Sequence, residues 1–71
     1  MTYLLRFFKK GEERCFQRYE NCNVIPAVDS YVYVVDVKFH VLDVSISYGD
    51  RDDVQIMVDV TIEEVEEEYD D

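Results

Sequence analysis

The stretch VQIMVDVTI, residues 54–62, decides the fold of this protein. Its apolar residues fall at every second position: Val54, Ile56, Val58, Val60 and Ile62. A period of two over nine residues predicts a β-strand with one buried face. Val58 then belongs to the core and Asp59 to the exposed face, so we expect Val58→Asp to unfold the domain and Asp59→Asn to be nearly silent.

The preceding segment, residues 42–48, has the same alternation in Leu42, Val44, Ile46 and Tyr48. Residues 49–53, which follow it, are rich in turn formers, so the two segments predict a β-hairpin. Just upstream, Phe39 and Val41 are out of phase with the Leu42 series. This break predicts a β-bulge that bends the strand from one face of the sheet to the other, as happens in small barrels.

Three more strands are expected. Residues 31–35 are β-branched and aromatic, and residues 2–8 and 13–20 flank a turn in which Gly11 can adopt a positive φ. Residues 14–19 would also form a short helix, but strand is the favoured interpretation. Five strands in 71 residues predict an all-β fold, either a five-stranded small SH3-like barrel or a curled antiparallel sheet.

The C-terminal segment supports two interpretations. Thr61 and Glu64 resemble a capping box, and Ile62, Val65 and Tyr69 have near-helical spacing, which predicts a short C-terminal helix. The carboxylates at the end of such a helix oppose its dipole, so the alternative is a strand extension followed by a tail. We expect one small β domain over residues 1–62 and an acidic C-terminal tail over residues 63–71.

A resemblance to a known group of proteins rests on the middle of the chain. Ile25-Pro26-Ala27-Val28 is followed by Tyr31-Val32-Tyr33-Val34 and by Lys38-Phe39-His40-Val41-Leu42-Asp43-Val44-Ser45. This order, over about residues 24–62, resembles small SH3-like barrel proteins of bacteriophages and mobile elements, which show a V-P-x-V-G-D-x-V segment and a K-Y-x-V-x-x-V strand. The resemblance implies the fold and a phage setting, but no catalytic residue. Asp29-Ser30 replaces the usual Gly-Asp, and Asp36-Val37 stands at a turn that usually contains Gly, so we expect turns of a different type.

The charge is large and unevenly distributed. The chain has 17 acidic and 7 basic residues, for a net charge of −10. Residues 1–19 hold five basic and two acidic residues, whereas residues 20–71 hold two basic and 15 acidic residues. This balance disfavours direct binding to nucleic acid and adsorption to anionic membranes, and no apolar run reaches the 18 residues of a membrane span.

The acidic surface is the candidate functional feature. We expect it to bind a protein with a basic surface, such as a nuclease, and to inhibit that nucleic-acid-handling protein by presenting carboxylates in place of phosphates. A generic protein-binding module and a phage structural or assembly component are the alternatives. The candidate partner-binding residues are Asp43, Asp50, Asp52, Asp53, Asp59, Glu63, Glu64, Glu66, Glu67, Glu68, Asp70 and Asp71.

Sequence signals for catalysis or metal binding are weak. The only histidine, His40, lies within a predicted strand and is expected to be partly buried or at the surface. Cys15 and Cys22 lack the spacing of a zinc knuckle, and the aspartates of residues 50–53 lack an EF-hand register. We therefore expect no enzyme activity, no cofactor and no metal. We expect Cys15 and Cys22 to be free thiols in a cytoplasmic protein, located in the host cytoplasm if it is phage-encoded. We also expect a monomer or small homo-oligomer.

Overall fold

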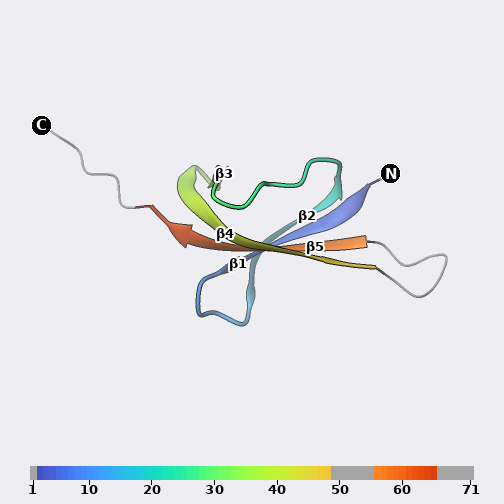
Figure 1. Cartoon of the computed structure of the whole chain (residues 1–71), viewed down its shortest axis with the longest axis horizontal. Helices are drawn as coiled ribbons and strands as arrows, with labels where there is room; N and C mark the ends of the chain where they lie inside the picture. Colours follow the sequence, from blue (N-terminus) through green and yellow to red (C-terminus); the bar gives the residue numbers. More distant parts are fainter. Residues whose placement is uncertain (1, 49–55, 66–71) are drawn as a thin grey trace, which may run out of the picture.

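The computed structural model describes residues 2–48 and 56–65 of the chain. These residues form five β-strands and no helix (Figure 1), which confirms the all-β prediction. The strands are β1 (Tyr3–Lys9), β2 (Cys15–Cys22), β3 (Tyr31–Val34), β4 (Val37–Ser47) and β5 (Ile56–Glu64). No helix among the described residues is long and apolar enough to cross a membrane.

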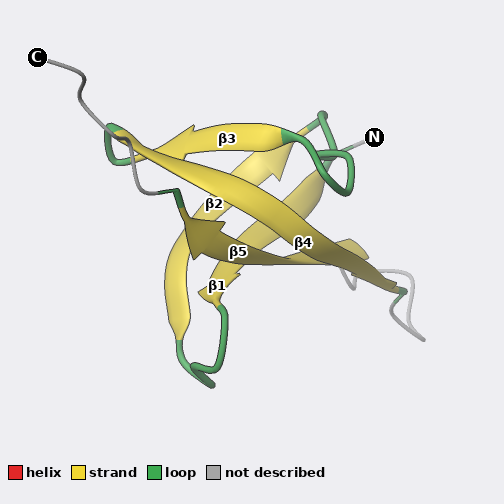
Figure 2. Ribbon diagram, turned by 60° about the vertical axis from the view of Figure 1, so that its left-hand side comes forward, coloured by secondary structure: helices red, strands yellow, loops and turns green. Residues whose placement is uncertain are grey.

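The strands form one strongly curled sheet in the order β2-β1-β5-β4-β3 (Figure 2). Three neighbouring pairs are antiparallel, but β1 and β5 run parallel, with Tyr3 opposite Ile56 and Lys9 opposite Ile62. The predicted five-stranded curled sheet is confirmed, but the sheet is mixed because this one pair is parallel. Each antiparallel pair is joined directly along the chain, whereas β1 and β5 are separated by three other strands, so no local turn sets their relative direction.

The predicted hairpin and its bulge are both present. β4 pairs antiparallel with β5, and the register shifts between Val41 and Asp43, where Leu42 is the additional residue. Before the shift, Phe39 and Val41 point into the core, and after it Val44 packs against the same core. The bulge thus keeps the apolar side chains of both halves of β4 on the inner face of the sheet.

Two connections use positive φ angles without glycine. Asp29 has φ 69°, and the two-residue turn between β3 and β4 has φ 52° at Val35 and 64° at Asp36. The expectation that these turns would differ from glycine turns is wrong in this respect, because the backbone adopts the conformation that glycine favours. Val35 is the most unusual of the three, since a β-branched side chain is strained at positive φ. In the β1–β2 turn, Gly11 has φ 79°, as predicted.

The core lies on the inner face of the curled sheet. Val58, Val60 and Ile62 of β5 have no exposed surface, which confirms the buried face that the alternation predicts. The remaining buried residues are Leu5, Phe7, Val34, Phe39 and Val41. The rings of Phe16 and Phe39 meet edge to face at 5.6 Å, so β2 curls over β4 without pairing with β3. The sheet is a half-barrel, and β2 and β3 are its two edges.

The end of β5 follows the strand-extension interpretation rather than the helix. β5 continues to Glu64, and the N–H of Val65 donates to the carbonyl of Lys38 at 3.1 Å, which extends its pairing with β4. The helix interpretation is therefore wrong for residues 61–65, while residues 66–71 lie outside the described part. Glu63 and Glu64, which the sequence analysis assigned to the tail, belong to the strand.

Candidate partner-binding surface

The twelve candidate carboxylates divide into two groups. Four lie in described strands: Asp43, Asp59, Glu63 and Glu64. The other eight lie outside the described residues: Asp50, Asp52, Asp53, Glu66, Glu67, Glu68, Asp70 and Asp71. These eight carboxylates and one arginine give residues 49–55 and 66–71 a net charge of −7, out of −10 for the chain. Most of the net charge is therefore carried by two short segments.

The two acidic segments are attached at opposite ends of β5. Residues 49–55 precede the first residue of β5, and residues 66–71 follow Val65, which continues the strand. A strand of nine residues spans roughly 26 Å at ~3.3 Å per step. The acidic segments therefore start from points about that far apart. The β4–β5 hairpin is the part of the described structure that lies between these points.

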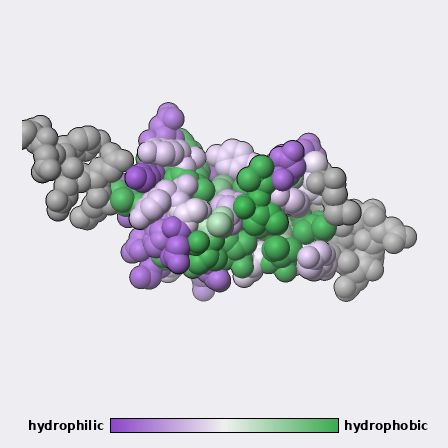
Figure 3. Space-filling view, turned by 45° about the horizontal axis from the view of Figure 1, so that its top comes forward, coloured by the Kyte–Doolittle hydropathy of each residue, from purple (hydrophilic) through white to green (hydrophobic). Residues whose placement is uncertain are grey.

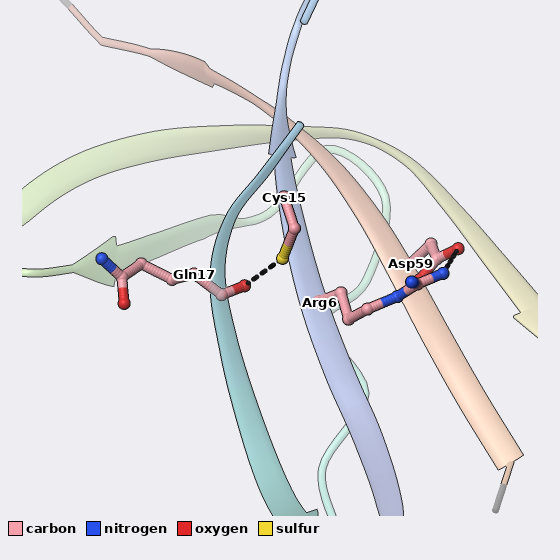
Figure 4. A network of polar contacts seen from close by, with 4 residues as sticks. All are labelled: Arg6, Cys15, Gln17 and Asp59. Atoms are coloured by element: carbon pink, nitrogen blue, oxygen red, sulfur yellow. Dashed lines mark hydrogen bonds and ion pairs between the residues drawn. The ribbon is translucent and has the colours of Figure 1, made fainter. Parts of the chain in front are cut away.

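Asp59 lies on this hairpin but is already paired. Its carboxylate accepts two hydrogen bonds from Arg6, at 2.7 Å from Nε and 2.8 Å from Nη2 (Figure 4). The two residues stand opposite each other in the parallel β1–β5 pair, and their side chains are 30% and 28% exposed. The hydrogen bond to Asp59 is the main cause that raises the pKa of Arg6 above its ordinary value, so the guanidinium stays charged. Asp59 is therefore neutralised within the sheet, which corrects its prediction as a free, exposed partner-binding carboxylate.

The other three described carboxylates are exposed. Asp43 stands opposite Thr61 and Glu63 stands opposite His40, so Asp43 and Glu63 are diagonal neighbours on the outer face of the sheet. Within the described part of the chain, the one ion pair that involves either of them is a loose contact of 4.0 Å between Oε1 of Glu63 and Nζ of Lys10. Glu64 stands opposite Phe39 and is on the other face of β5 from Glu63. Asp43 and Glu63 thus supply negative charge near the C-terminal end of β5.

His40 has a local structural environment. Its Nε2 lies 3.3 Å from Oδ1 of Asp29, and its ring centroid lies 5.2 Å from that of Tyr31. Its side chain is 29% exposed, which confirms the prediction of a partly buried histidine. The contact with Asp29 ties the loop between β2 and β3 to the middle of β4.

Both cysteines are free thiols, as predicted. Cys15 and Cys22 are the two ends of β2, seven steps or roughly 23 Å apart, far beyond the reach of a disulfide. The thiol of Cys15 donates to the carbonyl of Gln17 at 3.2 Å (Figure 4). Among the described residues, no three His, Cys, Asp or Glu side chains lie together in a way that could hold a metal ion.

β3 corresponds to the exposed aromatic strand, residues 31–35, that could supply a self-complementary edge to an assembly component, but its residues are not among the candidate partner-binding residues. Tyr31 and Tyr33 leave 57% and 69% of their surface exposed, and Nζ of Lys38 lies 4.8 Å from the ring centroid of Tyr31. The alternation of tyrosines with valines is the sequence signal for this exposed strand.

No protein-family model matches the chain, and neither the curated proteins nor the solved structures give a significant match.

Proposed function

We propose that this protein is a small binding domain that docks on a basic surface of a nucleic-acid-handling protein, such as a nuclease, and inhibits it. The supporting observation is the negative charge at the two ends of β5. Acidic segments adjoin both ends, and exposed Asp43 and Glu63 add charge beside the C-terminal end. The two ends are roughly 26 Å apart, which corresponds to about eight base pairs of duplex DNA, and carboxylates at this separation would imitate phosphates of the duplex.

Distributed charge of this kind acts mainly on association. An exposed ion pair contributes only about 0.2–1 kcal/mol, so no single carboxylate should dominate the affinity. Opposite fields on the two partners accelerate encounter and make binding weaker as salt increases. Asp59 adds little to the negative electrostatic potential of the hairpin, because Arg6 neutralises its charge. Residues 49–55 and 66–71 are therefore the main sources of this potential.

Affinity capture from a bacterial lysate at low and high salt, followed by competition, tests this proposal. The triple variant Asp50→Asn, Asp52→Asn, Asp53→Asn should lose tenfold or more in affinity for the captured partner, chiefly through a slower association rate. The matched control changes Glu12, Glu13 and Glu20 to Gln, which removes the same charge from the β1–β2 hairpin and should have little effect. The partner should be unable to hold DNA or RNA and this protein together. A partner that binds both at once, with an affinity independent of salt, would contradict the mimicry proposal.

The two free edges of the half-barrel favour a second candidate function, a structural or assembly component of a phage particle. The resemblance to phage proteins supports either role, and the first role would place the protein in the host cytoplasm. Light scattering at several concentrations separates the two. A discrete ring or a stable dimer would favour assembly, whereas a strict monomer would favour inhibition.

A further inference from the structure

The two edges of the half-barrel differ in how well they are protected against pairing. β2 is interrupted by two register shifts against β1, and Asn21 has φ 58° at one of them. Exposed, charged Arg18 and Glu20 also lie on this edge. Bulges and charges are devices that prevent another strand from adding to an edge. β3 has no bulge, because all four of its residues pair with β4 in unbroken register. The strand also contains no charged residue.

The hydrogen-bond pattern of the β3–β4 hairpin shows which groups of β3 face outward. A two-residue turn makes the flanking pair, Val34 and Val37, a hydrogen-bonded pair, and the pairs alternate from there. The even-numbered residues of β3 therefore bond to β4. The hydrogen bond of 2.9 Å from the N–H of Val41 to the carbonyl of Ser30 agrees with this parity.

The N–H and C=O groups of Tyr31 and Tyr33 consequently point away from β4. Among the described residues, no backbone hydrogen bond of a turn or loop engages them. They provide two donors and two acceptors in a regular row, which is the arrangement that an added strand requires.

Exposed apolar side chains gather around the same edge. Of the ten large hydrophobic residues that are exposed in the described part of the chain, four lie in β3, in the turn that follows it or at the start of β4: Tyr31, Tyr33, Val35 and Val37. Figure 3 shows that hydrophobic residues also reach the surface across the middle of one face of the molecule. A strand added to β3 would cover exposed surface of Tyr31 and Tyr33 as well as satisfy the backbone groups.

Charges at the ends of β3 indicate what kind of segment fits. Asp29 and Asp36 bracket the strand and both are exposed. Each lies in a turn with positive φ just outside the extended strand, and Asp29 also contacts Nε2 of His40 at 3.3 Å. Nζ of Lys38 lies 4.8 Å from the ring centroid of Tyr31, the first residue of β3. A segment with a basic residue at each end and uncharged residues between matches this pattern.

A second copy of the chain fits less well. Each copy carries a net charge of −10, so two copies repel each other when their edges approach. The charge pattern therefore favours a basic partner over self-association.

We propose that β3 is a docking edge for an extended segment of a partner protein, which adds to the sheet as a sixth strand. The segment has about eight residues, apolar side chains at alternate positions and Lys or Arg at both ends. Its main chain bonds to Tyr31 and Tyr33, and its basic ends meet Asp29 and Asp36. This inference goes beyond the proposed function, because it uses a different surface from residues 49–55 and 66–71.

The probe is the synthetic peptide acetyl-KTVTVTVK-amide, added to the full chain and followed by NMR amide exchange. The amides of Tyr31 and Tyr33 should exchange rapidly in the free protein and at least tenfold more slowly with the peptide, whereas Val32 and Val34 are protected throughout. The charge-reversed peptide acetyl-ETVTVTVE-amide should bind at least tenfold more weakly. Protection at β2 instead, or at no edge, would overturn the proposal.

Two variants at one position separate the backbone from the side chain. Tyr33→Pro removes an outward N–H but no hydrogen bond to β4, and should abolish binding, whereas Tyr33→Thr keeps the N–H and should retain it. Thermal melting checks that both variants fold. If the proline variant unfolds, N-methylation of alternate peptide residues tests the same main-chain bonds from the ligand side. Equal binding by Tyr33→Pro and the parent chain, or undiminished binding of both alternately N-methylated peptides, would refute strand addition.

Two further measurements isolate this proposal from its alternatives. The Asp50, Asp52, Asp53 triple variant should bind the peptide as the parent chain does, so failure of the carboxylate proposal leaves the docking edge standing. A dimer seen by light scattering without peptide, in which the amides of Tyr31 and Tyr33 are protected, would show that a second copy occupies the edge and would overturn the choice of partner.

Discussion

Asp59→Asn tests the link between the two halves of the sheet. The bidentate contact of Asp59 with Arg6 joins β5 to β1, two strands that no turn connects and whose contacting residues are 53 positions apart. The substitution preserves the shape of the side chain but removes its charge. It also replaces one acceptor oxygen by an NH₂ group that faces the guanidinium of Arg6, so one of the two hydrogen bonds is lost.

The expected magnitude follows from the geometry. A hydrogen bond to a charged group contributes about 1.5–3 kcal/mol when it is well formed. Both side chains are nearly a third exposed, so water replaces part of the loss. We therefore expect Asp59→Asn to lower the free energy of unfolding by about 1–2 kcal/mol, which corrects the expectation from the alternation alone that this change is nearly silent. For a domain of this size, each kcal/mol corresponds to a fall of about 4–8 °C in melting temperature.

Urea unfolding of a double-mutant cycle provides the measurement. Asp59→Asn and Arg6→Met should each be destabilising, and the double variant should lose less than their sum, with a coupling of about 1 kcal/mol. Asp43→Asn is the matched control, since Asp43 is an exposed aspartate on the adjacent strand and should change stability by at most about 0.5 kcal/mol. Equal effects of Asp59→Asn and Asp43→Asn, with no coupling to Arg6, would refute the role assigned to the pair.

Three further predictions concern stability. Val58→Asp should unfold the domain, because it places an unpaired charge at a position with no exposed surface; circular dichroism that still shows a cooperative β transition would contradict the register of β5. The double change Val35→Asn, Asp36→Gly should raise the free energy of unfolding by about 1–2 kcal/mol, because Asn and Gly tolerate the positive φ of this turn; an unchanged or lower value in urea titration would argue against the turn conformation. A reductant should leave the melting temperature unchanged, because Cys15 and Cys22 cannot reach each other in β2; a drop of several degrees would reveal a disulfide.

Local sequence patterns predicted much of the fold. The period of two in residues 54–62 predicted a strand and its buried face, because alternate side chains of a strand point to opposite sides. The break in phase between Val41 and Leu42 predicted the bulge, since one additional residue inverts the alternation. Gly11 marked the first hairpin turn. Each of these features depends on residues that are close together in the chain.

The tertiary structure decided the features that depend on distant residues. The packing of the β1–β2 hairpin against strands β3–β5 decides three of these features. They are the parallel pairing of β1 with β5, the partner of Asp59 and the position of β3 at an edge. Side-chain burial specifies which face of each strand turns inward, but not which strand lies beside it or in which direction. Pairing between strands also decides the turn at Val35 and Asp36. The pairing of β3 with β4 holds both residues at positive φ, although neither is a glycine, the residue from which sequence reasoning predicts this conformation.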